Sequence, residues 1–255
     1  MALHGWIIID KPLGMGSTNI VGWVKRALRE AGEPKTRVGH GGTLDPLATG
    51  VLPIAIGEAP KLAGHMLGAT KAYDFTIAFG GQTDTLDLEG KVIATSEHRP
   101  IRAEIEAILP RFTGPIEQVP PAYSALKIDG KRAYDLARAG EEVVLKTRAV
   151  TVFALKILPV QADGEELQEI TLSATVSKGT YIRSLARDIA LALGTVGHVT
   201  MLRRTRAGPF TLEQAISLDF LDVAAKSREL DGAVLPLIAG LDDIPALPVT
   251  PDDAK

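Results

Sequence analysis

The order of the predicted strands and helices along the chain is the feature that most constrains its fold. Tyr73, Phe75, Ile77 and Phe79 alternate with residues of the opposite face, as in a half-buried strand. Further strands are predicted over residues 5–10, 51–56, 148–160, 167–176 and 196–206, and helices over 17–31, 58–67, 101–109, 131–138 and 180–193. Because these elements do not alternate as in a parallel βαβ fold, we expect the α+β class.

Composition excludes several functional classes. The 255 residues are 45% hydrophobic and 23% charged, which fits one large globular domain with at most a small appendage. The absence of cysteine excludes disulfides, a thiolate nucleophile and Cys-ligated zinc, and the five histidines have no metal-ligand spacing. Since neither a signal peptide nor an apolar run of about 18 residues is visible, we expect a cytoplasmic protein without a membrane span.

Charge is distributed unevenly along the chain. The net charge is −3, yet residues 171–210 contain six basic side chains and one acidic one. Lys178 and Arg183 lie near the start of the helix predicted there, where free backbone N–H groups favour a phosphate or a carboxylate. This window therefore fits either a polyanion-binding surface or a solvated basic face without a partner.

The glycine-rich segment 37–50 does not match a nucleotide-binding motif. Residues 39–44 within it and residues 14–19 both begin as Gly-x-Gly but lack the final small residue of a dinucleotide fingerprint, and no P-loop occurs. Asp45 is followed by a proline, which stiffens the loop. Its carboxylate fits either a nucleophile or an ordinary Asx-type turn.

Seven short sequence blocks occur in order within residues 5–210. They are Asp10-Lys11-Pro12-x-Gly14, Gly39-His40-x-Gly42-Thr43-Leu44-Asp45-Pro46-Leu47-Ala48-Thr49-Gly50-Val51-Leu52-Pro53, Lys71-x-Tyr73, Thr83-Asp84-Thr85-x-Asp87, Val119-Pro120-Pro121-x-Tyr123-Ser124-Ala125-Leu126-Lys127, Ser177-Lys178-Gly179-Thr180-Tyr181-Ile182-Arg183 and Leu202-Arg203-Arg204. Together these blocks resemble the TruB-type tRNA pseudouridine synthases, the family that makes pseudouridine-55. Gly41 is a departure, since the family usually has threonine there.

The resemblance implies a fold and a reaction. The fold is a pseudouridine-synthase fold, with a mixed, mainly antiparallel sheet flanked by helices and an RNA-binding thumb inserted at about residues 120–150. The reaction is the isomerisation of a T-loop uridine at position 55 of tRNA, without cofactor or metal. By resemblance Asp45 is the essential carboxylate, Arg183 pairs with it, and Tyr73 stacks on the flipped uracil and helps to remove the final proton.

The resemblance also implies how RNA is bound. His40 inserts into the T-loop beside the extruded base, and Tyr181 and Leu202 form walls of the base pocket. Lys127 of the thumb, Lys178 and Arg204 are expected to bind the RNA. The expected partner is the T-arm stem-loop of tRNA, bound by a monomer, with no DNA and no membrane partner.

Two rival functions and one domain question remain open from the sequence. A nucleosidase or glycoside hydrolase would use Asp84 or Asp87 as a second carboxylate, and a non-catalytic RNA-binding or RNA-folding module would use only the basic window. We expect residues 1–239 to form the catalytic domain. We expect 240–255 to be a linker toward a PUA-type C-terminal domain that the chain lacks; a naturally short enzyme is the alternative.

Overall fold

A single large sheet organises the molecule. The computed structural model describes residues 3–124, 126–128, 130–141, 143, 145–159 and 165–242. Within this part of the chain the sheet has nine strands, and every pair is antiparallel except β3 with β12. Its main path runs β1 (Gly5–Lys11), β3 (Ala48–Ile56), β12 (Gly197–Ala207), β4 (Lys71–Phe79), β11 (Glu169–Val176), β10 (Arg148–Ile157) and β7 (Gly114–Gln118), while β2 (Val38–His40) pairs with β3 and β13 (Phe210–Thr211) with β12.

Helices and two small hairpins complete the fold. The hairpins are β5 (Gly81–Thr83) with β6 (Val92–Thr95) and β8 (Lys127–Ile128) with β9 (Lys131–Arg132). The α-helices are α1 (Ser17–Glu30), α2 (Ala63–Gly68), α3 (Arg102–Ile108), α4 (Ala133–Arg138), α5 (Ile182–Ala192) and α6 (Leu218–Ser227). Short 3-10 turns cover Ala59–Lys61, Leu109–Phe112, Leu212–Gln214, Leu230–Ala233 and Leu237–Leu241. None of the described helices is long and apolar enough to cross a bilayer.

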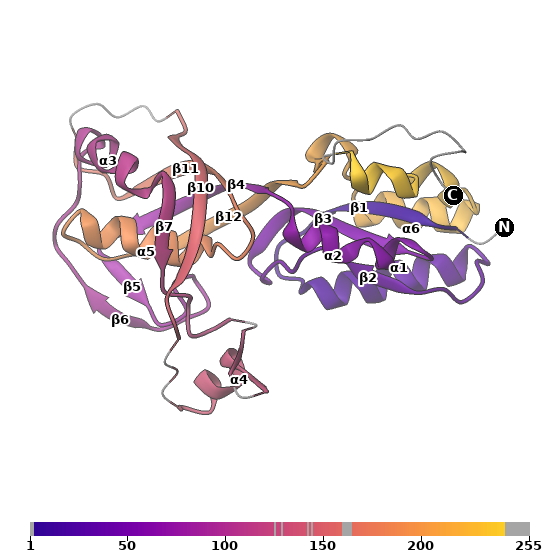
Figure 1. Ribbon diagram of the computed structural model, residues 1–255, viewed down its shortest axis with the longest axis horizontal. Coiled ribbons are helices and arrows are strands. Elements are labelled where there is room, and N and C mark those ends of the chain that lie inside the picture. The colour runs from indigo at the N-terminus through magenta and orange to yellow at the C-terminus, as the bar shows by residue number, and fades with distance from the viewer. Residues whose placement is uncertain are drawn as a thin grey trace, which may run out of the picture.

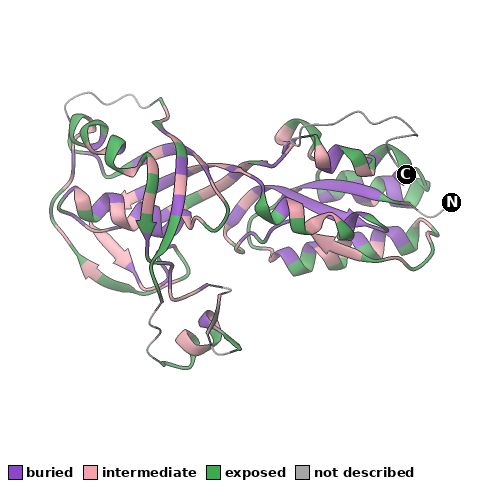
Figure 2. Cartoon of the chain, viewed as in Figure 1, coloured by how far each residue is buried: buried purple, intermediate pink, exposed green. Residues whose placement is uncertain are grey.

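The molecule has two halves joined by strands β4 and β12, which run between them (Figure 1). In the half on the left, α5 packs on the sheet through Leu185 and Ile189, which belong to the same buried cluster as Phe75 and Ile77. In the half on the right, α1 and α6 cover one face of β1 and β3, where Leu52 is buried. Figure 2 shows this burial as purple bands along the strands and on one face of the helices.

Two side chains pack against the apolar clusters of both halves. Tyr73 on β4 and Leu202 on β12 are each partly buried, and each contacts the cluster under α5 as well as the cluster under α1. In the sequence analysis, Tyr73 is expected to stack on the flipped uracil and Leu202 to form a wall of the base pocket. The junction of the two halves is therefore where an open site can be built on rigid strands.

Residues 119–147 form an excursion from the sheet. Gln118 at the end of β7 pairs with Arg148 at the start of β10, so the chain leaves and returns at one place. Helix α4 within the excursion projects away from both halves (Figure 1). This segment corresponds to the insertion expected at about residues 120–150, and its binding of RNA stays a prediction.

Most of the predicted helices and strands are confirmed, and the structure has further elements that were not predicted. The longest of these are β7 and α6, and the shorter ones are β2, β5, β6, β8, β9 and β13. Strand β7 lies in a proline-rich stretch because Pro115 stands in an edge strand, where one backbone N–H is dispensable. A serine at the start of a helix commonly caps it, but the cap residue of α1 is Gly16, without a side-chain bond, and Ser17 is the first helical residue. Most of the expected linker 240–255, from residue 243 on, lies outside the described residues.

Candidate active site

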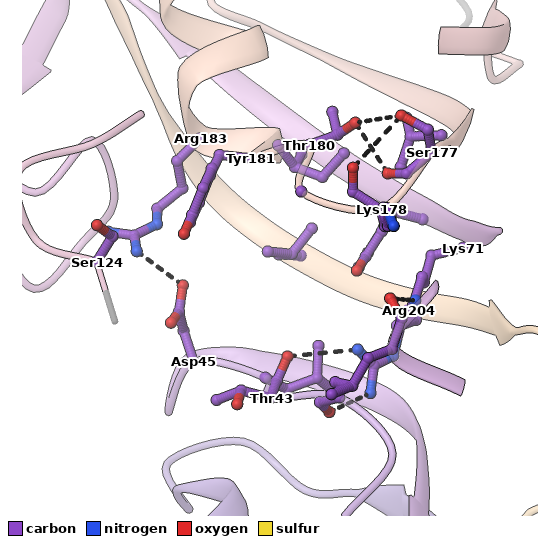
Figure 3. A pocket seen from close by; sticks show the side chains of 18 residues that line it. Thr43, Asp45, Lys71, Ser124, Ser177, Lys178, Thr180, Tyr181, Arg183 and Arg204 are labelled. Carbon is purple, nitrogen blue, oxygen red and sulfur yellow. Dashed lines mark hydrogen bonds and ion pairs between the residues drawn. The ribbon is translucent and has the colours of Figure 1, made fainter. Parts of the chain in front are cut away.

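A cavity of about 320 Å³ lies at the junction of the two halves. This volume is in the range of pockets that hold small ligands. Most of its lining comes from four segments: the loop 42–45 before β3, Lys71 and Tyr73 on β4, residues 176–183 leading into α5, and Leu202 and Arg204 on β12 (Figure 3). Leu67 of α2 and Ser124 complete the lining. Seven of the nine side chains predicted from the sequence line it, namely Asp45, Tyr73, Lys178, Tyr181, Arg183, Leu202 and Arg204.

An ion pair crosses one side of this cavity. Arg183 Nη2 lies 2.9 Å from Asp45 Oδ2 (Figure 3), and the Asp45 side chain is 45% exposed whereas that of Arg183 is only 7% exposed. The guanidinium is fixed from behind, because it donates to the carbonyl oxygens of Thr85 at 2.7 Å and Tyr123 at 2.9 Å. A buried, immobile cation thus aims a carboxylate that remains open to the pocket.

Asp87 lies behind the same arginine. Its Oδ2 is 3.2 Å from Arg183 Nη1, and its Oδ1 accepts bonds from the Thr85 hydroxyl at 2.6 Å and the Glu89 N–H at 3.0 Å. Asp87 is buried and does not line the main cavity. It therefore balances the buried arginine and holds it in place; it is not arranged as the second catalytic carboxylate of a hydrolase.

The aromatic wall of the cavity comes from two different elements. Tyr73 extends from β4, and Tyr181 is the N-cap residue of α5. Burial raises the pKa of the Tyr181 phenol. Gln118 holds Tyr181 by the backbone: its Oε1 accepts from the Tyr181 N–H at 2.8 Å and its Nε2 donates to the Tyr181 carbonyl at 3.2 Å.

Arg204 lines the cavity but its hydrogen bonds go to the backbone. The side chain, on a residue only 1% exposed, donates to the carbonyl oxygens of Val51 at 2.7 Å, Gly42 at 3.0 Å and Thr43 at 3.4 Å. Figure 3 shows it lying along the loop that leads to Asp45. The neighbouring Arg203 instead forms an ion pair with Asp10, so the arginines of β12 do not form one common patch.

Two buried lysines bind backbone carbonyls near the site. Lys11 Nζ donates to the carbonyl oxygens of Pro12, Met15 and Pro46, and burial lowers the pKa of Lys11 to about 8, although the nearby Asp45 carboxylate opposes this shift. Lys71 donates to the carbonyls at the end of α2, those of Met66, Leu67 and Ala69. The carbonyls lie beside the loop or the pocket wall, where they are buried. The two ammonium groups give them the hydrogen bonds that water would otherwise provide.

Two of the predicted residues do not belong to the cavity. His40 lies on β2 outside its lining; burial lowers the pKa of its imidazole, and its buried Nδ1 has no partner in the described part of the chain. The side chain of Lys127 lies outside the described residues. The roles predicted for both stay predictions.

Sequence reasoning missed the residues that hold the site in place. Gln118 carried no signal, since a glutamine beside a proline-rich segment is ordinary on a surface. Lys11 and Lys71 stood inside the quoted blocks, and a lysine next to a buried apolar strand could have indicated a buried ammonium. Among the described residues no group of three histidines, aspartates or glutamates could hold a metal ion.

Two family models together match most of the chain. The model described as TruB family pseudouridylate synthase, N-terminal domain, matches residues 26–182, and the model described as tRNA pseudouridylate synthase B C-terminal domain matches residues 183–242. The boundary between them falls inside α5, immediately before Arg183. The ion pair with Asp45 therefore joins the two matched regions.

Similar proteins are found in several bacteria. The chain is 61% identical over 253 residues to a protein of Novosphingobium aromaticivorans named tRNA pseudouridine synthase B, covering 99% of this chain and 83% of that protein. It is 59% identical over 254 residues to the protein of the same name from Zymomonas mobilis, covering 100% of this chain and 82% of the relative.

Solved structures of similar fold come from larger assemblies. A chain in the crystal structure of a Cbf5-Nop10-Gar1 complex superposes with a TM-score of 0.71 at 29% identity, covering 94% of this chain and 62% of that one. A chain of an H/ACA RNP bound to a substrate RNA containing 2′-deoxyuridine gives a TM-score of 0.69 at 28% identity, with 94% and 61% covered. The present chain thus spans less than two thirds of each of these two structural relatives.

Proposed function

The chain belongs to the TruB family of pseudouridylate synthases, and from this premise we propose that it isomerises the uridine at position 55 in the T-loop of tRNA to pseudouridine. The family match and the two bacterial relatives at about 60% identity support the isomerisation of a tRNA uridine. The position in the T-loop is our proposal. The observation that best supports the isomerase reaction is the half-exposed Asp45 carboxylate held at 2.9 Å by the buried Arg183.

The reaction exchanges one bond to the ribose for another. The bond between N1 of uracil and C1′ breaks, the uracil turns while it is bound, and C5 bonds to C1′. The proton on C5 is then lost and N1 gains one, so the product has the composition of the substrate. Because the leaving group is also the returning group, one carboxylate suffices, whereas glycoside hydrolases generally use two.

Asp45 supplies that carboxylate. It either attacks the nucleotide to form a covalent intermediate or stabilises the positive charge that develops on the sugar when N1 leaves. Arg183 holds one of its oxygens and is itself held by Asp87 and two carbonyls, so the carboxylate is aimed before the substrate arrives. Such preorganisation costs no rearrangement during the reaction.

The remaining cavity residues fit the handling of a base. Tyr73 and Tyr181 offer aromatic surfaces and Leu202 an apolar one, which suits a uracil taken out of its stack. The Tyr73 hydroxyl is the group we assign to removal of the C5 proton. His40, which lies outside the cavity lining, inserts into the T-loop beside the extruded base, and Lys127 and Lys178 bind the RNA.

Both rival functions are less compatible with the site. A hydrolase needs a second free carboxylate, but Asp87 is buried against Arg183, and Asp84 accepts bonds from the Lys91 N–H at 2.9 Å and the Tyr123 hydroxyl at 3.4 Å. A pure RNA-binding module has no need of an arginine buried to aim a carboxylate. We therefore retain neither.

The experiment is to incubate the chain with a T-arm stem-loop RNA and to analyse its nucleosides by chromatography and mass spectrometry. We expect one pseudouridine per RNA and no free uracil. Asp45→Asn keeps the shape of the side chain and removes its charge, so it should lower the rate by more than about 10³-fold while the RNA still binds.

The controls separate the alternatives. A stem-loop with cytidine at the target position should yield no product. Release of free uracil would indicate a hydrolase, and equal activity of Asp45→Asn would exclude the proposed role of the carboxylate. Conversion of uridines outside the T-loop, with position 55 untouched, would contradict the proposed position alone.

A further inference from the structure

Ser17, the first residue of α1, makes two hydrogen bonds to one residue of the Asp45 loop. Its hydroxyl oxygen accepts a bond from the Leu44 N–H at 2.8 Å and donates one to the Leu44 carbonyl at 3.0 Å. Ser17 is only 3% exposed and Leu44 is buried as well. Since Leu44 immediately precedes Asp45, this hydroxyl fixes the peptide groups from which the carboxylate projects.

The other neighbour of Asp45 is fixed by the same stretch of chain. The Pro46 carbonyl accepts bonds from the Gly14 N–H at 2.9 Å and from Lys11 Nζ at 3.1 Å. Residues 11–17 thus hold the backbone on both sides of Asp45. They do so from the end of β1 and the start of α1, which are packed in the apolar core of one half.

Asp45 itself has little to hold its side chain in place. The carboxylate is 45% exposed, and the ion pair that the structure assigns to it in the described residues is the one with Arg183. Its direction in the pocket therefore depends on where the backbone of residues 44–46 lies. A displacement of about 1 Å at a reacting group can lower the rate of a reaction by about 100-fold.

We propose that Ser17 is a positioning residue for the reaction, acting through Leu44 to set the place of the Asp45 carboxylate against Arg183. The inference rests on the role of Asp45 given under the proposed function. Without the hydroxyl, the buried N–H and carbonyl of Leu44 have lost their partner, and the loop must shift to regain one. Ser17 does not line the cavity, so we expect the loss of its hydroxyl to act mainly on kcat and little on KM.

The test compares Ser17→Ala with the conservative Ser17→Thr, which keeps the hydroxyl. For a T-arm stem-loop we expect Ser17→Ala to lower kcat by about 10- to 100-fold with KM within about 2-fold of wild type. Ser17→Thr should recover most of the loss. Equal kcat for wild type and Ser17→Ala would overturn the proposal, as would a change in KM alone.

A matched control separates position from stability. Ser217 caps α6, where its hydroxyl accepts from the Phe220 N–H at 3.1 Å, and it does not line the cavity. Ser217→Ala should lower the urea midpoint of unfolding, as the loss of a cap does, and leave kcat unchanged. If both alanine variants lowered kcat in proportion to their loss of stability, Ser17 would be structural only.

Two further measurements complete the test. Arg183→Lys and Ser17→Ala should together lower kcat by less than the product of their separate effects, because both act on the same ion pair; independent effects would contradict the proposal. If Ser17→Ala shows no cooperative unfolding, Ser17→Cys replaces it, with the same expectation and the same contrary result. An inactive Asp45→Asn beside a fully active Ser17→Ala would remove this inference and leave the proposed function intact.

Discussion

The two partners of the central ion pair are held by different parts of the molecule. The loop that carries Asp45 is bound by Arg204 and by residues 11–17, all of them attached to the apolar core around β1, β3 and α1. Arg183 is bound instead by Asp87 and by the carbonyls of Thr85 and Tyr123, and Tyr123 lies in the excursion 119–147. The start of its helix is bound by Gln118, at the root of that excursion.

The positions of Arg183 and Asp45 therefore depend on different parts of the molecule. Val119, the first residue of the excursion, accepts bonds from the Ser184 hydroxyl at 2.9 Å and from Arg187 Nη2 at 3.0 Å, so α5 is tied to this root at several points. Within the described part of the chain, no hydrogen bond or ion pair joins the loop 42–45 to the excursion. We expect substitutions at the root of the excursion to displace Arg183. Substitutions near β1 and β12 should instead displace the Asp45 carboxylate.

Among these variants, Arg183→Lys should lower kcat the most, because it removes the guanidinium that pairs with Asp45. An ammonium cannot bind Asp45, Asp87 and two carbonyls in one plane. We expect kcat to fall by about 10²- to 10³-fold, measured as pseudouridine formed in single-turnover reactions. A rate near that of wild type would contradict the pairing with Asp45.

Arg204→Met tests the carboxylate side alone. It leaves the buried carbonyls of Gly42 and Val51 without their donor, so we expect a loss of about 2–4 kcal/mol in the free energy of unfolding and a fall in kcat of about 100-fold. Urea unfolding and single-turnover kinetics measure the two effects. Unchanged stability would show that the loop does not depend on this arginine.

Gln118→Ala tests the cation side alone. The variant loses both bonds to the Tyr181 backbone, so the first turn of α5, which contains Arg183, should be less well fixed. We expect kcat to fall by about 10-fold without a change in the Asp45 loop. Gln168, an exposed glutamine whose Oε1 accepts from Arg99 Nε, provides the control Gln168→Ala, which should be fully active. Equal rates for both variants would contradict the assignment.

The smallest effect concerns Lys11, a titratable group that belongs only to the carboxylate side. Its folded-state pKa of about 8 lies below the ordinary 10.5, so between these values the unfolded chain binds a proton that the folded chain has released. The free energy of unfolding therefore rises with pH in this window on account of Lys11, and this group adds no slope at lower pH.

Urea unfolding of wild type and Lys11→Met between about pH 7 and about pH 9.5 measures this contribution. Wild type should gain stability over the variant as the pH rises through the window. A constant difference between the two proteins would mean that Lys11 keeps its proton throughout.

Local pattern was enough to predict most of the fold. Alternation along 73–79 and helical spacing along 182–192 depend on neighbours in the sequence, so β4 and α5 could be predicted. The cap of α1 could not, because Ser17 bonds to Leu44, which is 27 residues away, and a short-range rule assigns its hydroxyl to its own helix. Helix α6 was missed although its apolar positions pack on α1.

Residues of the site could be predicted where they belong to a recognisable motif. They were missed where a side chain binds backbone groups far away in the sequence. The family resemblance located Asp45, Arg183 and the walls of the cavity. It assigned Arg204 to RNA binding, whereas the structure directs the guanidinium to carbonyls 153 to 162 residues away in the sequence. No local pattern indicates that Gln118 will bind the backbone of a residue 63 positions further on.

The parallel pairing of β3 with β12 has a consequence for the order in which the protein folds on the ribosome. Strands β1, β3 and β4 are made within the first third of the chain, yet the strand that joins β3 to β4 in the sheet is Gly197–Ala207. Such non-local pairings form slowly and leave strand edges exposed in the meantime. The two halves can begin to collapse early, but the pocket between them closes only after β12 has been synthesised, so catalytic competence is acquired as one of the last events of folding.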